Sequence, residues 1–267
     1  MNCRQCRSGN VIKYGKYKSY QKYKCKNCNR QFTERSFSFF ARHRYPEEVI
    51  INGILFFFFV STRNAVFLLK ESIGFKPSNV SVYNWNKKFA QHLSKIQRSR
   101  NFSNIWHVDE KFIKVKDSLD DFAYEWVVMD DINSIIAVHV SKKRDITGAR
   151  KVLELAKKNA DKPPDILVTD GLLAYIKASK KVFGRKVKHV KAHFKTERFM
   201  HQRRYYMLSN NRIESLNSKI NLWYKKFRGF KSTETASLWC NMWMFFYNVM
   251  RPRIVEHKTI SIHQLIA

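Results

Sequence analysis

The chain has 267 residues, 44% of them hydrophobic, which is enough for one to three domains with packed cores. Lys and Arg number 51 against 21 Asp and Glu, and the resulting formal net charge of +30 repels itself unless a polyanion neutralises it. DNA or RNA is therefore the expected partner, with strongly salt-dependent binding; a ribosome-associated or membrane-surface protein is the alternative. An aromatic content of 15% argues against a disordered basic tail.

The N-terminus and the most apolar segment bear on the compartment. The sequence runs directly into Cys3 and basic residues, so no secretory signal is expected. Residues 49–60 are strongly apolar but are interrupted by Asn52 and Gly53, and they fall short of the roughly 20 residues that a membrane span requires. We therefore expect a buried helix there, no membrane partner, and a cytoplasmic, prokaryotic protein associated with the nucleoid.

Four of the five cysteines form two closely spaced pairs, Cys3-x-x-Cys6 and Cys25-x-x-Cys28, with 18 residues between the pairs. Each such turn can direct two thiolates at one ion, and two turns complete a tetrahedral zinc site. The alternative is a pair of disulfides in a secreted domain, which the missing signal and the odd number of cysteines disfavour.

The residues between the cysteine pairs predict a zinc ribbon over residues 1–36. Residues 11–14 and 21–24 have the pattern of two short strands, and residues 15–20 would connect them as a hairpin. A segment of this size cannot form a sufficient core, so one structural Zn²⁺ would supply the folding free energy. The fifth cysteine, Cys240, is expected to be a buried core thiol.

A helical module is predicted over residues 45–95. Pro46 suits the first position of a helix, and a second helix is expected over residues 62–73, where Gly74 and Pro77 then break the pattern. Ser78 or Asn79 could cap a third helix.

The third helix of this module has two distinct faces. Val82, Trp85 and Phe89 are expected to point inward. The candidate DNA-binding residues on its other face are Asn79, Ser81, Asn84, Lys87 and Lys88. A glycine-containing turn before a polar, basic last helix indicates a helix-turn-helix that reads the major groove, and an ordinary three-helix packing unit is the alternative. Residues 95–104 form a polar linker.

Beyond the linker the pattern changes from helical to strand-like. Strands are predicted at 105–116, 123–130, 134–141, 166–168 and 188–192, and helices at 147–159, 172–183, 211–227 and 233–249. Three strands followed by alternating helices and strands give the element order of the ribonuclease-H-like fold. The predicted fold class is therefore α/β: a ribonuclease-H-like core over residues 104–250, preceded by the zinc ribbon and the helix-turn-helix, with a tail at 251–267.

Three acids occupy special positions in this order. Asp109 lies in the first strand, Asp170 ends the fourth strand beside it, and Glu214 lies on the polar face of a helix that crosses the sheet. Carboxylate oxygens are preferred ligands of Mg²⁺. Two Mg²⁺ or Mn²⁺ ions about 3.5–4 Å apart can activate a water or a 3′-hydroxyl and stabilise the leaving oxygen of a phosphodiester. We therefore predict a catalytic metal site, whereas Glu110, Asp130, Asp131 and Asp165 are interpreted as solvated charges or caps.

The acidic motifs resemble a known family. Trp106-His107-Val108-Asp109-Glu110, followed by Phe-Ile-Lys-Val at 112–115, resembles the first catalytic motif of DDE insertion-sequence transposases. Asn-Asn-Arg-Ile-Glu at 210–214, followed by Arg-Gly-Phe-Lys-Ser at 228–232, resembles the third.

Within these transposases the chain is similar to insertion-sequence family six, in its archaeal-looking branch with an N-terminal zinc ribbon, from Cys3 to about Tyr247. The resemblance implies a ribonuclease-H-like core with Asp109, Asp170 and Glu214 as the metal-binding triad. It also implies recognition of terminal inverted repeats in double-stranded DNA and assembly as a homodimer or higher oligomer.

The chain departs from this family in two places. The 43 residues between Asp170 and Glu214 exceed the usual interval, and the surplus is expected at residues 193–208, a basic segment. Arg203 and Arg204 in this segment are candidate DNA contacts. A basic residue usually follows the catalytic Glu by seven positions, where this chain has Asn221, so Lys219 is the candidate phosphate contact instead.

Two further roles concern histidines. His107 is expected to pack in the strand or support the acids rather than bind metal. His189 and His193 lie on a strand and at its exit, so no second zinc site is predicted.

The sequence thus predicts a transposase that binds element ends and target DNA, cleaves them and transfers strands. One alternative is a non-catalytic DNA-binding regulator that keeps the zinc ribbon and helix-turn-helix of a transposase, and the three acids count against it. A nuclease or resolvase on the same fold is another, and the N-terminal reading modules count against that.

Overall fold

The computed structural model describes residues 1–3, 5–17, 20–33, 36, 38–41, 43–96, 101–192, 197–201 and 204–250. Arg203, His193 and the predicted tail at 251–267 lie outside these residues. The described chain divides into two compact units: Met1–Phe57 with Thr62–Phe89, and Phe58–Ser61 with the described residues from Ala90 onward. In the described part of the chain, no helix combines the length and the apolar character needed to cross a membrane.

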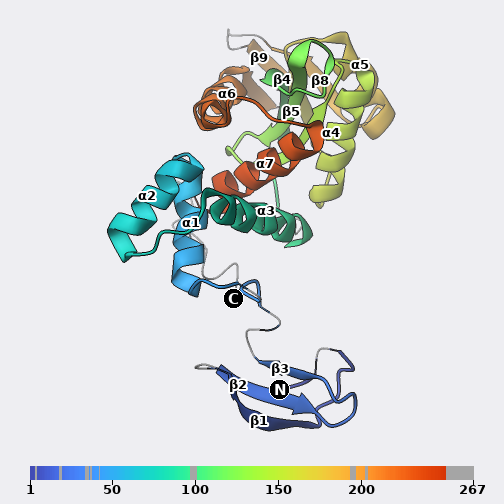
Figure 1. The fold of residues 1–267 in the computed structure, drawn as a ribbon. Coiled ribbons are helices and arrows are strands. Elements are labelled where there is room, and N and C mark those ends of the chain that lie inside the picture. Colours follow the sequence, from blue (N-terminus) through green and yellow to red (C-terminus); the bar gives the residue numbers. More distant parts are fainter. Residues whose placement is uncertain are drawn as a thin grey trace. The chain divides into compact units, whose positions relative to one another are not determined.

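A small antiparallel sheet opens the first unit (Figure 1). Its strands are β1 (Val11–Tyr17), β2 (Tyr20–Cys25) and β3 (Gln31–Thr33), in the order β1-β2-β3. The two predicted strands are confirmed, and β3 is an addition. Phe32 on β3 is buried with Cys3 and Cys25, and its ring stacks on that of Tyr23 with centroids 6.0 Å apart. This cluster is very small, so the fold of the sheet depends on what joins the cysteines.

Three helices follow, α1 (Glu47–Phe59), α2 (Thr62–Ile73) and α3 (Asn79–Ile96). Gly74 ends α2 in the left-handed region with φ 71°, a conformation that glycine adopts without steric cost. Ser78 caps α3, because its Oγ accepts a hydrogen bond from the Ser81 amide at 3.0 Å. The predicted helix starts and the glycine turn are therefore confirmed.

The inner face of α3 packs closely on α1. Val82, Trp85 and Phe89 are buried as predicted. A Cβ atom at Gly53 of α1 would lie only 2.9 Å from the Trp85 ring, so glycine permits this close approach. Asn86, also buried, donates a hydrogen bond to the Val82 carbonyl at 2.9 Å.

The second unit contains a five-stranded sheet in the order β6-β5-β4-β7-β8 (Figure 1). The strands are β4 (Ile105–Lys114), β5 (Phe122–Asp130), β6 (Ile135–Ser141), β7 (Ile166–Thr169) and β8 (Lys188–Lys191). β4, β5 and β6 pair antiparallel, whereas β4, β7 and β8 pair parallel. This order and these directions are those of the ribonuclease-H-like fold, as predicted.

Helices cover both faces of this sheet. The helices of the unit are α4 (Ile146–Asn159), α5 (Leu173–Phe183), α6 (Asn211–Tyr224) and α7 (Thr233–Phe245), with short helical turns at Leu119–Asp121, Lys225–Phe227 and Phe246–Met250. The α4 and α5 helices bury one face, in a core that includes Trp106, Val108 and Leu167. The α6 helix lies along the other face of β4.

A hairpin inserted before α6 was not predicted. Its strands β9 (Glu197–His201) and β10 (Arg204–Leu208) pair antiparallel and form a sheet of their own. Leu208, Phe199 and Tyr206 pack on Ile105, Val168 and other residues of the main sheet. The surplus that the sequence expected at 193–208 therefore includes a packed element.

Candidate active site and metal centres

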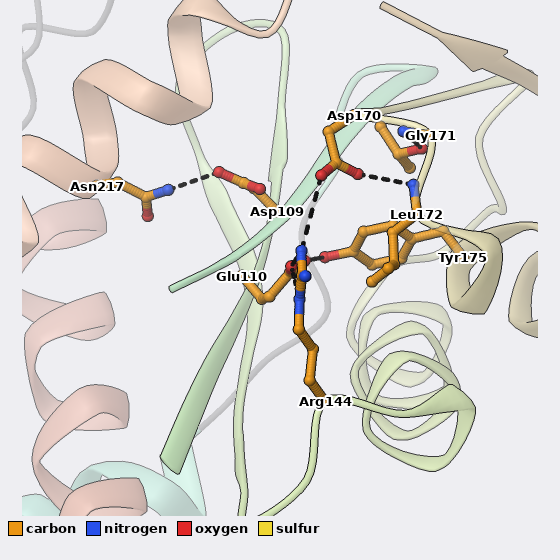
Figure 2. A network of polar contacts seen from close by, with 9 residues as sticks. Asp109, Glu110, Arg144, Asp170, Gly171, Leu172, Tyr175 and Asn217 are labelled. Atoms are coloured by element: carbon orange, nitrogen blue, oxygen red, sulfur yellow. Dashed lines mark hydrogen bonds and ion pairs between the residues drawn. The ribbon is translucent and has the colours of Figure 1, made fainter. Parts of the chain in front are cut away.

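The central strand β4 presents its two neighbouring acids to opposite faces of the sheet, because side chains alternate along a strand. Asp109 faces α6, where its Oδ2 accepts a hydrogen bond from Asn217 Nδ2 at 2.7 Å (Figure 2). Glu110 faces α4 and α5, where it meets Arg144 and Tyr175. One strand thus supplies a carboxylate to each side.

Asp170 follows the last residue of β7, the parallel neighbour of β4. The parallel pairing of β4 with β7 includes His107 and Val168, which lie two residues before Asp109 and Asp170, so the two acids lie at the same level of adjacent strands. Gly171 then turns the chain with φ 96°, and the Leu172 amide donates to Asp170 Oδ1 at 2.9 Å. This local turn fixes the orientation of the carboxylate (Figure 2).

The third acid, Glu214, lies half-buried in the first turn of α6. Glu214 and Asn217 are three positions apart and therefore share a face of the helix. Asn217 has no predicted role from the sequence, although its spacing from Glu214 is a signal that could have suggested one. Its Oδ1 is buried and has no hydrogen-bond partner among the described residues.

The electrostatics of Asp109 reflect this neighbourhood. Burial is the main cause that raises the pKa of Asp109, to about 7. Negative charges also raise it, and these come from Glu110, Asp170 and Glu214. The three predicted acids are therefore close enough to act on one another. They are not as compact as the cysteine cluster, which is the only group of three or more potential ligands within 4.8 Å in the described chain.

An ion pair between a buried carboxylate and a partly exposed arginine supports the opposite face of the site. The Glu110 side chain is only 3% exposed, and its Oε1 accepts from Arg144 Nε at 2.6 Å. The Tyr175 hydroxyl donates to Glu110 Oε2, and Arg144 also reaches to 4.0 Å from Asp170 (Figure 2). The interpretation of Glu110 as a solvated charge is therefore wrong. Arg144, which the sequence reasoning missed, links Glu110 to the predicted ligand Asp170.

Asp130 also differs from its interpretation as a solvated acid. It is fully buried at the end of β5, and its Oδ1 accepts from the Ser134 amide at 2.6 Å in the turn to β6. Asp165 accepts from Asn104 Nδ2 at 2.7 Å, so it joins two strand starts. Both acids are structural.

Asn221, which stands where a basic residue was expected, contacts a lysine of β4. Asn221 Oδ1 accepts from Lys111 Nζ at 2.9 Å, and Lys111 also pairs with the buried Glu125 at 3.5 Å. Burial lowers the pKa of Lys111, and the charge of Glu125 opposes that effect. A lysine of β4 therefore lies where the resembling family has a basic residue on the helix. Lys219 is half-buried, and its DNA contact stays a prediction.

His107 and His189, the two described members of the three histidines considered from the sequence, have structural surroundings. His107 is buried in β4, and burial lowers its pKa to about 4. His189 Nε2 lies 2.9 Å from Thr169 Oγ1, next to Asp170 in sequence. His189 therefore supports the end of β7.

The first unit holds the four paired cysteines in one cluster. All four sulfurs lie within 4.8 Å of one another, with Cys3 and Cys28 at 3.6 Å and Cys6 and Cys25 at 3.5 Å. Four thiolates about 2.3 Å from a tetrahedral zinc would lie about 3.8 Å apart, close to these separations. The cluster is therefore compatible with one zinc ion and fits a zinc ribbon.

Backbone hydrogen bonds in the CxxC turns favour thiolates at Cys3 and Cys25. The backbone amide of Cys6 hydrogen-bonds to Cys3 and is the main cause that lowers the pKa of Cys3, to about 6. The backbone amide of Cys28 does the same for Cys25. At Cys6 a backbone hydrogen bond from Ser8 acts in the same sense, but the neighbouring Cys25 thiol and burial outweigh it and raise the pKa of Cys6 to about 12. Deprotonated sulfur is the form that binds zinc. Cys240 is buried on α7, as predicted, and burial raises its pKa.

The candidate DNA-binding residues of α3 do not all have the same surroundings. Asn79, Asn84 and Lys87 are exposed, and Ser81 is half-buried. Lys88 instead lies 3.1 Å from His43 Nε2 and donates to the Phe39 carbonyl. Its ammonium group therefore has partners within the first unit, and its DNA contact stays a prediction.

Two exposed apolar residues, Val80 and Tyr83, adjoin Asn84 on α3, and sequence reasoning did not single them out. Of the two hairpin arginines, Arg203 lies outside the described residues. Arg204 begins β10, and its side chain is not described.

A family model described as a DDE domain, of the IS240 transposase type, matches residues 103–251, which is more than half of the chain. The chain belongs to the IS240 family of DDE transposases. No curated protein matches it. The matched DDE domain contains the five-stranded sheet and all three predicted catalytic acids.

Two solved structures are similar to the chain. One is the integrase catalytic core domain of HTLV-2 with magnesium, at 18% identity and a TM-score of 0.29, covering 35% of this chain and 63% of that one. The chain therefore spans less than two thirds of that relative. The other is the simian T-cell lymphotropic virus intasome with a B56 gamma subunit, at 13% identity and a TM-score of 0.38, covering 78% and 70%. Both scores are low, so the fold assignment rests on the strand order of the DDE domain itself.

Replacing one paired cysteine should remove zinc. Cys25→Ser is expected to reduce the zinc content from about one ion per chain to near zero, because three thiolates leave the tetrahedral site open. Elemental analysis of the purified full chain measures this, and Cys240→Ser is the matched control that should keep its zinc. Undiminished zinc in Cys25→Ser would exclude this cluster as the site.

The raised pKa of Asp109 predicts a pH dependence of stability without added magnesium. The folded chain holds this proton up to pH of about 7, whereas the unfolded chain loses it near the ordinary value of 3.8. The stabilising contribution is therefore present at acidic pH and is lost as the pH rises toward 7 and above. Thermal unfolding midpoints at acidic and alkaline pH should differ less in Asp109→Asn than in the unmodified chain or in the exposed-site control Asp161→Asn.

The Glu110–Arg144 pair should show coupling in unfolding experiments. Arg144→Gln leaves the Glu110 carboxylate buried without its cation, and should lower the free energy of unfolding by about 1–3 kcal/mol. This is below the range for a fully buried pair because the Arg144 side chain is 41% exposed. The double variant Glu110→Gln/Arg144→Gln should be more stable than Arg144→Gln. Additive losses in calorimetry would show that the pair is not coupled.

Proposed function

We propose that this chain is a transposase that binds the terminal inverted repeats of an insertion sequence and catalyses metal-dependent DNA cleavage and strand transfer. The observation that carries the proposal is the acid cluster of a DDE domain: Asp109 lies on β4, Asp170 directly follows its parallel neighbour β7, and Glu214 shares a face of α6 with Asn217, which donates to Asp109. The net charge of +30 supports a polyanionic substrate for the chain as a whole.

Asp109, Asp170 and Glu214 would hold two divalent ions, Mg²⁺ or Mn²⁺. The donor set fits hard cations, since it is made of carboxylates whose mutual repulsion a cation would relieve, with the unpaired buried Oδ1 of Asn217 beside them. Bound ions would activate a water or a 3′-hydroxyl and stabilise the leaving oxygen of the phosphodiester. The acids need not be as close together as the cysteines, because they would hold two ions rather than one.

The neighbouring residues would keep the acids in place. Asn217 donates to Asp109 and limits its rotation. The Leu172 amide fixes one oxygen of Asp170, and the Arg144 guanidinium, held by Glu110, lies beside the other. Supporting contacts of this kind hold reacting groups in a productive geometry.

Recognition of element ends would belong to the N-terminal modules. We propose a zinc ribbon at residues 1–36 with one structural Zn²⁺ on Cys3, Cys6, Cys25 and Cys28, and a helix-turn-helix at residues 45–95. In the latter, Asn79, Ser81, Asn84 and Lys87 would contact DNA; they are supported by their place on α3. The catalytic domain would be residues 104–250. These modules also support placement in insertion-sequence family six, in the branch with a zinc ribbon.

An oligomer would be needed for the complete reaction. Each chain has one set of the three acids, whereas an element has two ends to process and join to one target. A homodimer or higher oligomer on DNA would supply a set for each end. The reaction would take place at the chromosome.

Cleavage mapping tests the function directly. The protein and its gene's native flanking DNA, incubated with Mg²⁺ or Mn²⁺, should give discrete cuts at inverted repeats. Asp109→Asn should reduce cutting by at least about 100-fold while leaving end binding intact, because a metal ligand is lost and the reading modules are not. The exposed-site variant Asp161→Asn is the matched control.

The other outcomes point to other functions. Tight, specific binding without cuts would favour a regulator, and scattered cuts would favour a nuclease. Loss of binding together with cutting in Asp109→Asn would count against the proposed role of that residue.

A further inference from the structure

The β9–β10 hairpin has two chemically different faces. Cross-strand partners lie on the same face of a hairpin, and the register pairs Phe199 with Tyr206, Met200 with Tyr205, and Arg198 with Met207. Phe199 and Tyr206 are partly buried against the main sheet. The residues of the outer face are Arg198, Met200, Tyr205 and Met207, and all four are exposed.

The inner face places the hairpin beside the acid cluster. Its Leu208 is buried with Ile105 and Val168. Side chains alternate along β4, so Ile105, which lies four residues before Asp109, faces the same side of the sheet. Leu208 is also the last residue of β10, and α6 begins at Asn211 with Glu214 in its first turn. The hairpin thus packs on the sheet face that carries Asp109 and leads directly into the helix that carries Glu214.

The outer face combines an aromatic ring with a cation. The Arg198 guanidinium carbon lies 3.9 Å from the centre of the Tyr205 ring. Tyr205 is 61% exposed, and the thioether side chains of Met200 and Met207 flank this pair. Three large apolar side chains exposed together on one short hairpin are unfavourable in water unless a partner covers them.

Nucleobases with an open face fit this surface. An aromatic ring stacks on any base, and a nearby arginine adds a contact to the phosphate backbone or to the base. Inside a continuous duplex both faces of each base are already stacked, so such a base cannot lie flat on Tyr205, whereas an unpaired base can. The charge of the chain favours a nucleic acid over an apolar peptide as the occupant.

We propose that the outer face of the β9–β10 hairpin, formed by Arg198, Met200, Tyr205 and Met207, binds unpaired nucleobases of DNA next to the acid cluster. The inference rests on the proposed function in taking DNA as the substrate. It adds that the strand processed by the acids is locally unpaired, with one or more bases stacked on the hairpin. The chain would then prefer DNA with unpaired ends over fully paired DNA.

The experiment compares two DNA probes with the full chain carrying Asp109→Asn, which keeps the DNA uncut. One probe is a blunt duplex of about 20 base pairs, and the other has about five additional unpaired nucleotides with the fluorescent base 2-aminopurine among them. The unpaired tail should tighten binding and change the fluorescence of the probe. Tyr205→Ala should weaken binding of the tailed probe by about 5-fold to 100-fold, with little effect on the blunt probe.

Two further variants serve as controls. Tyr205→Phe retains the ring and should retain the preference and the fluorescence change. Phe112→Ala removes an equally exposed ring, 61% exposed, from the opposite face of the main sheet, and should leave both unchanged. The hairpin residues are exposed, so circular dichroism should show an unchanged fold in every variant.

The possible results separate this proposal from the proposed function. An equal affinity for both probes, or a preference that survives Tyr205→Ala, overturns the hairpin site. A change of oligomeric state in Tyr205→Ala without a change in DNA preference would assign the face to a second copy of the chain, and also overturns it. A Tyr205-dependent preference in a chain that never cleaves element ends would uphold the hairpin site and reject the transposase.

Discussion

The strand β4 is hydrogen-bonded along both edges, to β5 in the antiparallel sense and to β7 in the parallel sense. A strand held on both sides cannot shift its register by one residue without exchanging every side chain between the two faces. Asp109 is therefore committed to the α6 face and Glu110 to the α4 and α5 face. The position of Asp170 follows from the same constraint, because the parallel pairing with β4 places the end of β7 beside Asp109.

Two further acids near the cluster, Glu125 and Glu110, are held by ion pairs. Lys111 and Glu125 form a buried pair beside α6, and the buried Glu110 pairs with the partly exposed Arg144 on the other face of the sheet. Pairs of this kind add little net stability, since desolvation offsets most of the attraction. Their effect is on arrangement: Glu110 and Glu125 each have a cationic partner, whereas Asp109 accepts a hydrogen bond from the neutral amide of Asn217.

The elements of the fold were predictable to the extent that their signals are local. Helix and strand periods, Gly74 and the cysteine spacing all act within a few residues, and the predicted elements agree with the structure. The burial of Glu110 was not predictable in this way, because its partners Arg144 and Tyr175 lie 34 and 65 residues away. The same reason applies to Lys88, whose carbonyl partner Phe39 is 49 residues distant.

The β9–β10 hairpin was not predicted, for a different reason. Its basic residues gave residues 193–208 the composition of a loop, although Phe199 and Tyr206 provide the apolar side that allows it to pack. At the site, position along the strands indicated the three acids. The supporting contacts of Asn217 and Arg144 became visible only when the helix and the loop before α4 were in place.

The distribution of cysteines gives the two parts of the chain different sensitivities to oxidation. Cys6 and Cys28 are exposed, and their sulfurs lie 3.5 and 3.6 Å from those of buried partners. Cys240, the only other cysteine, is buried. An oxidant therefore reaches the thiols that hold the small N-terminal sheet before it reaches the DDE domain. Oxidation would therefore damage the small N-terminal sheet, while the acid cluster of the DDE domain would stay chemically unchanged.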